Sequence, residues 1–228
     1  MLEDNQTPIS TYHEYILEAI SALRFGLSYY KQALQVPADV GSDPSMHHAE
    51  LFCRYSFLMI SNSLEAAANT LLLSLKFEKV SYDELEKLGT IAKFQLYCEL
   101  TKKKLNRSDV RLSRVKDIIT CRNEFVHPKP KVVNFRIDKD SSEIVFDIKR
   151  TNTRNYPKYF IELKPLQVLT ALDDTLNFIS WVCFDICQFD IVDGSFLLGL
   201  GTNTQNADLD IIGYEHKIKF DQRTFGQR

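Results

Sequence analysis

The sequence predicts an all-α protein: an antiparallel up-and-down helical bundle with an inserted β-hairpin and an irregular C-terminal tail. Long stretches place apolar residues at intervals of three, four and seven, which is the spacing of one helix face. Prolines, glycines and polar clusters separate these stretches, as is typical of loops. One short region after residue 130 changes to the two-residue alternation of strands. We therefore expect a helical domain over residues 1–192 and a tail over residues 193–228 that packs on it.

The composition is that of a soluble globular protein. The 228 residues are 44% hydrophobic and 25% charged, with a net charge of −2. Five cysteines, an odd number without paired spacing, favour a reducing compartment. The polar, acidic N-terminus differs from a secretory signal, and the most apolar run, residues 176–184, is too short to span a membrane. We expect a cytoplasmic protein without a membrane segment.

The first two predicted helices are the longest. Residues 9–35 carry one continuous apolar stripe. A loop with two prolines and a glycine follows, up to Pro44. Residues 46–76 form the second helix, which is apolar on nearly every side. Such a helix lies at the centre of its bundle or is shared with another subunit.

Shorter elements follow. Residues 81–104 contain two short helical pieces separated by Gly89. Beyond the helix described in the next paragraph, an alternating pattern predicts a β-hairpin over about 131–150, which has to pack on the bundle to be stable. Residues 165–191 form the last long helix, because their apolar residues again give a wide stripe.

The helix over residues 109–128 carries the most unusual pattern. Ser108 can cap its start, and Pro128 ends it because the residue before a proline leaves helical geometry. Arg122 lies on its apolar stripe, and His127 closes the last turn. The residues of that stripe are Val110, Val115, Ile118, Ile119, Phe125 and Val126.

Two interpretations of Arg122 are open, because a cation on a buried stripe is costly unless it is paired. The first is a structural arginine, with Glu65 of the second helix as a candidate partner and His127 helping to cap the helix end. The second is an anion site, in which Arg122 binds phosphate and His127 transfers protons near neutral pH. The spacing alone favours the structural arginine.

The segment from Arg122 to His127 resembles the Arg-x4–6-His signature of the HEPN superfamily, including the polar residue Asn123 directly after the arginine. Members of that family are helical bundles that carry the motif near the end of a late helix. The resemblance implies a dimer. It also implies an activity, since many members are metal-independent endoribonucleases, often toxins or defence proteins, whereas others only bind or scaffold. It covers about residues 9–190 in the order of helices, and six positions in the motif.

Basic residues are concentrated around this motif. Between Lys102 and Arg136, eleven basic residues face only three acidic ones. Solvated helices often carry such charge, but an excess that coincides with a phosphate site favours a nucleic-acid partner, and we expect RNA. The candidate RNA-binding residues are Arg111, Arg114, Lys116, Lys129 and Lys131.

The chemistry of RNA cleavage assigns a role to each motif residue. Arg122 would offset the charge of the phosphorane, because its planar donors match phosphate oxygens. His127 is the only nearby candidate for proton transfer, and Asn123 would orient His127 or donate to phosphate. Five helical steps separate Arg122 and His127 by about 140° around the helix and ~7.5 Å along it. Either the last turn unwinds, or two motif copies converge across a two-fold axis, which we favour.

The expected function is that of a metal-independent endoribonuclease of HEPN type, which cleaves RNA through attack of the 2′-hydroxyl and acts as a toxin or defence effector. The alternative is a catalytically inactive HEPN-like module that binds RNA, a nucleotide or a protein partner. The sequence implies neither a metal nor an organic cofactor. Besides RNA, the expected partners are a second copy of the chain and an antitoxin or regulatory protein.

Overall fold

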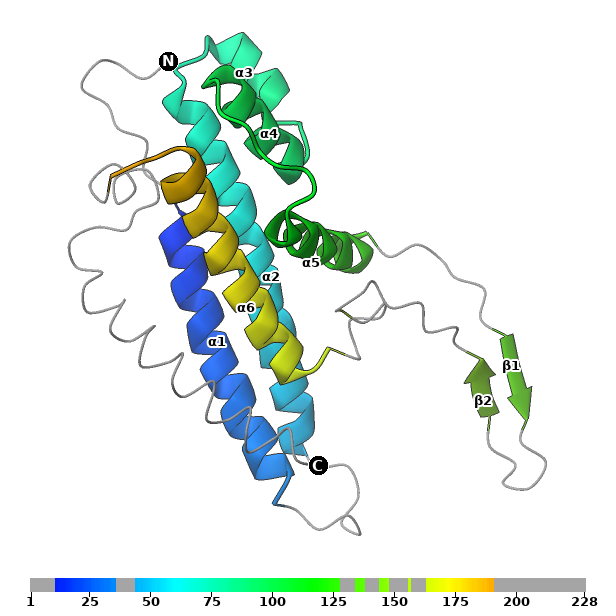
Figure 1. The fold of residues 1–228 in the computed structure, drawn as a ribbon. Coiled ribbons are helices and arrows are strands. Elements are labelled where there is room, and N and C mark those ends of the chain that lie inside the picture. The colour runs from blue at the N-terminus through cyan, green and yellow to red at the C-terminus, as the bar shows by residue number, and fades with distance from the viewer. Residues whose placement is uncertain are drawn as a thin grey trace.

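The structure is a computed structural model that describes residues 11–35, 44–127, 134–137, 144–147, 156 and 163–190. The chain is mostly helical over these ranges (Figure 1), which confirms the all-α prediction. None of the helices described is long and apolar enough to cross a membrane. The predicted C-terminal tail over residues 193–228 lies outside the described residues.

Three long helices lie side by side: α1 (Tyr12–Ala33), α2 (Pro44–Ser74) and α6 (Pro165–Ser180). Figure 1 shows that α1 runs antiparallel to α2, and that α6 runs in the same direction as α2. A π-helical segment, η2 (Trp181–Ile186), continues α6. The chain thus follows the predicted order of long helices, each within a few residues of its expected limits.

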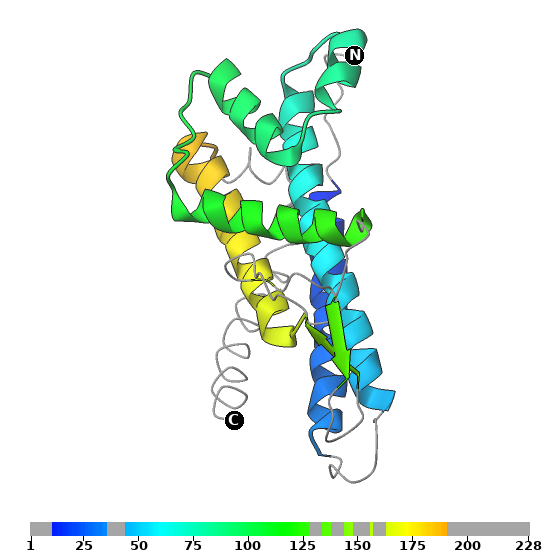
Figure 2. The ribbon, with the colours of Figure 1, turned by 90° about the vertical axis from the view of Figure 1, so that its right-hand side faces the viewer.

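The helix that carries the motif, α5 (Val110–Val126), does not run along the bundle but crosses α2 and α6 at a steep angle (Figure 2). Its first half is tied to α6, because Arg114 forms an ion pair with Asp174. Its other end is tied to α2, where the rings of Phe125 and Phe57 meet at a centroid distance of 5.8 Å. The prediction of a purely up-and-down arrangement is therefore wrong for α5.

Two short helices, α3 (Lys79–Leu85) and α4 (Thr90–Leu100), lie between α2 and α5 in the chain. Gly89 directly precedes α4, at the predicted break. The ring of Phe94 on α4 contacts Phe178 on α6 edge to face at 5.1 Å, so α4 belongs to the same core as the long helices.

The core lies where α1, α2 and α6 meet, and one close approach is visible in it. A Cβ atom at Gly26 of α1 would lie 3.0 Å from the Sγ atom of Cys53 on α2, so a larger residue there would push the two helices apart. Phe57 packs on Tyr156 at 5.5 Å, and Tyr156 is fully buried.

Two short strands, β1 (Asn134–Ile137) and β2 (Ile144–Asp147), pair antiparallel. Asn134 lies opposite Asp147, and Ile137 opposite Ile144. The residues between the strands lie outside the described residues. Figure 1 shows the pair to one side of the helices, so the expected packing of a complete hairpin on the bundle stays a prediction.

Candidate functional site

The start of α5 is fixed by Asp109 rather than by Ser108. A carboxylate oxygen of Asp109 accepts a hydrogen bond from the backbone N–H of Arg111 at 2.9 Å, which satisfies one of the unpaired amides of the first turn. The nearby Ser108 instead donates its own N–H to the side chain of Asn106. An aspartate is a natural cap here, because its negative charge also faces the positive end of the helix.

The buried face of α5 differs from the predicted stripe at both ends. Val110 and Val126 are exposed, at 59% and 44%. The residues of α5 that are buried are Leu112, Val115, Ile118 and Cys121.

Arg122 lies on this same side of the helix, four residues after Ile118, but near the end of α5, where its side chain is partly exposed. Its Nη1 atom donates a hydrogen bond to the side-chain oxygen of Asn123 at 3.1 Å. Within the described part of the chain, no carboxylate pairs with Arg122. Asn123 therefore holds the guanidinium rather than the imidazole of His127.

Glu65, the predicted partner of Arg122, has other partners. Its carboxylate binds the ammonium of Lys93 and the hydroxyl of Thr90, both on α4. The prediction fails because α4, and not the end of α5, lies against this part of α2. Lys93 is only 1% exposed, so Glu65 neutralises a cation that the fold has buried.

His127 ends α5. Its backbone N–H donates to the carbonyl oxygen of Asn123 at 3.0 Å, and its φ of −125° and ψ of 64° leave helical geometry. The side chain is exposed. Since α5 stays helical through Val126, the last turn does not unwind between Arg122 and His127. Regular helical geometry over this turn separates the positions of Arg122 and His127 by about 140° around the helix axis.

Arg114, a predicted RNA-binding residue, is part of the fold instead. Its Nη1 atom lies 2.8 Å from Oδ1 of Asp174, whose side chain is 2% exposed. Burial raises the pKa of Asp174, and the guanidinium of Arg114 opposes that rise. The other carboxylate oxygen, Oδ2, has no hydrogen-bond partner among the described residues. Arg114 thus favours the charged form of a buried carboxylate.

Arg111, another predicted RNA-binding residue, is also engaged. Its Nε and Nη2 atoms each lie 3.0 Å from a carboxylate oxygen of Asp109, and Nη1 lies 3.8 Å from Asp185. Its guanidinium carbon is 4.3 Å from the ring centroid of Trp181, a cation–π distance. The hydrogen bond from Arg111 lowers the pKa of Asp109. This arginine joins the start of α5 to η2.

The structure describes one of the three remaining predicted RNA-binding residues. Lys116 is exposed on α5, whereas Lys129 and Lys131 lie outside the described residues. Lys104 and Arg107 belong to the basic segment between Lys102 and Arg136 but were not predicted as site residues, and they line a pocket at the start of α5. The run of basic residues at 102–104 is the one sequence signal that could have indicated this pocket.

No group of three or more metal-binding side chains comes together in the described ranges. Comparison of the chain with known protein families, with curated proteins and with solved structures found no match.

Proposed function

We propose that the chain is an endoribonuclease of HEPN type that cleaves RNA without a metal, through attack of the 2′-hydroxyl on the neighbouring phosphate. A toxin or defence effector is the expected biological setting. The resemblance in the motif supplies the reaction, and the exposure and contacts of the motif residues support it.

One observation supports the proposal most directly. Arg122 is partly exposed, and its only hydrogen bond in the described part of the chain goes to the neutral side chain of Asn123. Its remaining N–H donors are therefore available for phosphate oxygens, which guanidinium groups bind in a planar, two-pronged geometry. A structural arginine would instead be expected to face a carboxylate, as Arg111 and Arg114 do.

The site requires two copies of the chain. Regular helical geometry separates Arg122 from His127 within one copy, so we propose that Arg122 of one copy meets His127 of the other across a two-fold axis. His127 would then take the proton of the attacking 2′-hydroxyl and deliver a proton to the leaving 5′-oxygen. Arg122 offsets the charge of the phosphorane, and Asn123 orients Arg122. Cleavage of this kind leaves a 2′,3′-cyclic phosphate and a 5′-hydroxyl.

The alternative is a non-catalytic module that binds RNA, a nucleotide or a protein. It is favoured by the same separation of Arg122 and His127, because a chain that never pairs its motif copies would bind phosphate without turning it over. An antitoxin or other regulatory protein remains a proposed partner under either function.

The decisive experiment incubates the purified protein with end-labelled RNA in the presence of a chelator. We expect cleavage by the wild type and a loss of about 10²–10⁴-fold in Arg122→Ala and His127→Ala, the usual effect of removing a proton-transfer or charge-stabilising group. Lys31→Ala, which removes an exposed cation from α1, is the matched control and should keep full activity. Intact RNA with the wild type, or cleavage by both motif variants, would overturn the nuclease proposal.

A mixing experiment tests the shared site. When Arg122→Ala and His127→Ala proteins exchange subunits, a mixed dimer regains one site with both wild-type groups. About a quarter of the wild-type activity should return if random pairing gives half mixed dimers with one intact site each. If both groups come from one copy, the mixture stays inactive.

A further inference from the structure

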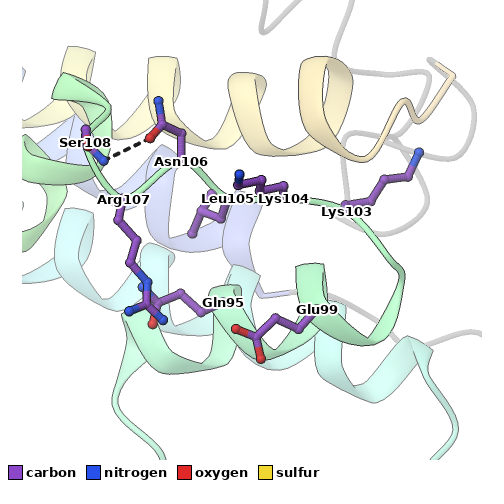
Figure 3. Close-up of a pocket in the computed structure, with 8 residues that line it drawn as sticks. All are labelled: Gln95, Glu99, Lys103, Lys104, Leu105, Asn106, Arg107 and Ser108. Carbon is purple, nitrogen blue, oxygen red and sulfur yellow. Dashed lines mark hydrogen bonds between the residues drawn. The ribbon is translucent and has the colours of Figure 1, made fainter.

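A pocket lies between α4 and the connector that leads into α5 (Figure 3). Its volume of about 370 Å³ falls in the range of small-molecule sites. The lining side chains are polar or charged, with a single buried apolar residue. They are Gln95, Glu99, Lys103, Lys104, Leu105, Asn106, Arg107 and Ser108.

The backbone of the connector is held at both ends, so the pocket is already formed. After α4, Lys102 has a positive φ of 57°, and the N–H groups of Lys102 and Lys103 bond back to the carbonyls of Glu99 and Cys98 at 3.1 and 2.7 Å. This is the hydrogen-bond pattern of a Schellman C-cap. Before α5, the side chain of Asn106 accepts from the N–H of Ser108 at 3.1 Å.

The charges around the pocket suit a phosphate group. Lys104 and Arg107 are both exposed, and neither forms a hydrogen bond or ion pair with the rest of the described chain. Figure 3 shows Arg107 reaching from the connector to Gln95 on α4. Lys103 points away, and its ammonium donates to Gln188 at 3.1 Å. Among the described residues, two cations without partners are therefore left beside one carboxylate, that of Glu99.

The remaining groups suit the rest of a nucleotide. The amide of Gln95 and the carboxylate of Glu99 offer donors and acceptors for a base or a ribose hydroxyl, while Leu105 provides apolar surface. A pocket that combines free cations, a polar edge and an apolar patch matches a nucleoside phosphate better than inorganic phosphate alone.

We propose that this pocket binds one nucleoside-phosphate unit of an RNA strand, and that the strand continues along α5 to the motif. The inference rests on the proposed function, since it places the substrate of that site. The pocket ends at Ser108 and the motif begins at Arg122, fourteen residues on, which is about 21 Å at 1.5 Å per residue. A stacked strand rises about 3.4 Å per nucleotide, so about six nucleotides join the two sites.

The test is RNA binding by fluorescence anisotropy with labelled oligoribonucleotides of four, eight and twelve nucleotides, in chelator. The pocket variant is the double substitution Lys104→Glu with Arg107→Glu, and the control of equal charge change is Lys31→Glu with Lys79→Glu, two exposed lysines outside both the pocket and α5. Competition with adenosine monophosphate distinguishes a free nucleotide from a strand. Thermal melting shows that both variants fold, as expected for exposed residues.

We expect the wild type to bind the longer RNAs at least about tenfold more tightly than the four-nucleotide one, because only they span both sites. The pocket variant should bind the twelve-nucleotide RNA at least about tenfold more weakly, and its slope of log affinity against log salt should fall by about 2. Equal losses in the control variant, no loss in the pocket variant, or displacement of the RNA by adenosine monophosphate at equal concentration would each overturn the inference.

Cleavage measured on the same samples separates this inference from the proposed function. If the wild type cleaves RNA but the pocket variant binds normally, the pocket is wrong and the nuclease stands. If the pocket variant loses binding but the wild type never cleaves, the pocket stands and the nuclease is wrong. If the wild type binds no RNA, both are wrong.

Discussion

The two ends of α5 carry arginines in opposite situations. At the first end, Arg111 and Arg114 face carboxylates from the helix cap, from η2 and from the buried side of α6. At the second end, Arg122 pairs, within the described ranges, only with the amide of Asn123, and His127 is exposed. The first half of α5 therefore carries arginines that pair with carboxylates, and the second half carries a partly exposed arginine on the same side. We call these the structural half and the open half of α5.

The difference shows that a basic segment in a sequence is not yet a binding surface. A cation close to the core is retained only where an acidic partner meets it, because an unpaired buried charge is costly. Asp174 and Asp185 lie more than fifty residues away in the sequence, and only the fold brings them to α5. The cations left for a polyanion are those without such partners.

An unpaired cation should be most costly where it is most deeply buried, and the pair of Lys93 and Glu65 provides that case. Glu65→Ala leaves an ammonium that is 1% exposed without its carboxylate, and we expect it to lower the free energy of unfolding by about 2–4 kcal/mol. Glu65 itself is 38% exposed, so water reaches the site and limits the loss. Urea denaturation measures the effect.

Lys93→Met is the control for Glu65→Ala. It fills similar space without a charge, so it should cost less than about 1.5 kcal/mol. Equal losses in the two variants would mean that packing, and not the unpaired ammonium, determines stability at this place.

Arg114→Ala tests the structural half of α5 directly. It leaves the buried carboxylate of Asp174 without its guanidinium, and we expect a loss of about 2 kcal/mol at pH 7. The loss is limited because Arg114 is 46% exposed and because Asp174 can bind a proton instead. Lys116→Ala, on the same helix but exposed, should change the free energy of unfolding by less than about 0.5 kcal/mol. A loss as large in Lys116→Ala would contradict the structural role of the ion pair between Arg114 and Asp174.

The pH dependence of stability tests Asp174 itself. Its pKa in the folded state is raised above the ordinary value of 3.8 by burial, so the folded protein binds more protons than the unfolded chain just above that pH. Stability contributed by this group is therefore present below pH 3.8 and declines as the pH rises to the folded pKa. Asp174→Asn should remove this decline, with a difference in slope of at most about 1.4 kcal/mol per pH unit. If the free energy of unfolding of the wild type and of Asp174→Asn changed with pH in parallel, this prediction would be refuted.

The helices could be predicted from the sequence because their apolar spacing and their breaks are local signals. Gly89 interrupts the chain where expected, and the limits of α1, α2 and α5 lie within three residues of prediction. The crossing of α5 could not be predicted, because it depends on contacts to Phe57 and Asp174, which no local pattern reveals.

The candidate site could be predicted only in part. Arg122 lies on the apolar side of α5 as predicted, but its side chain is partly exposed rather than buried, because it lies near the end of the helix. A signal for the structural arginines was present: Arg111, Arg114 and Arg122 fall on one side with Ile118, at steps of three and four. The sequence does not show which of these three arginines pairs with a carboxylate.

Arg122→Ala, the smallest expected effect on stability, completes the comparison because it repeats the Arg114→Ala change on the same side of the same helix. Arg122 is partly exposed and, among the described residues, bonded only to the exposed Asn123, so its removal leaves no buried charge behind. The free energy of unfolding should change by less than about 0.5 kcal/mol in urea denaturation, while the proposed RNA cleavage should be lost. A loss of more than about 1 kcal/mol would show that Arg122 is structural after all, and any loss of cleavage in that variant would then report on folding rather than on chemistry.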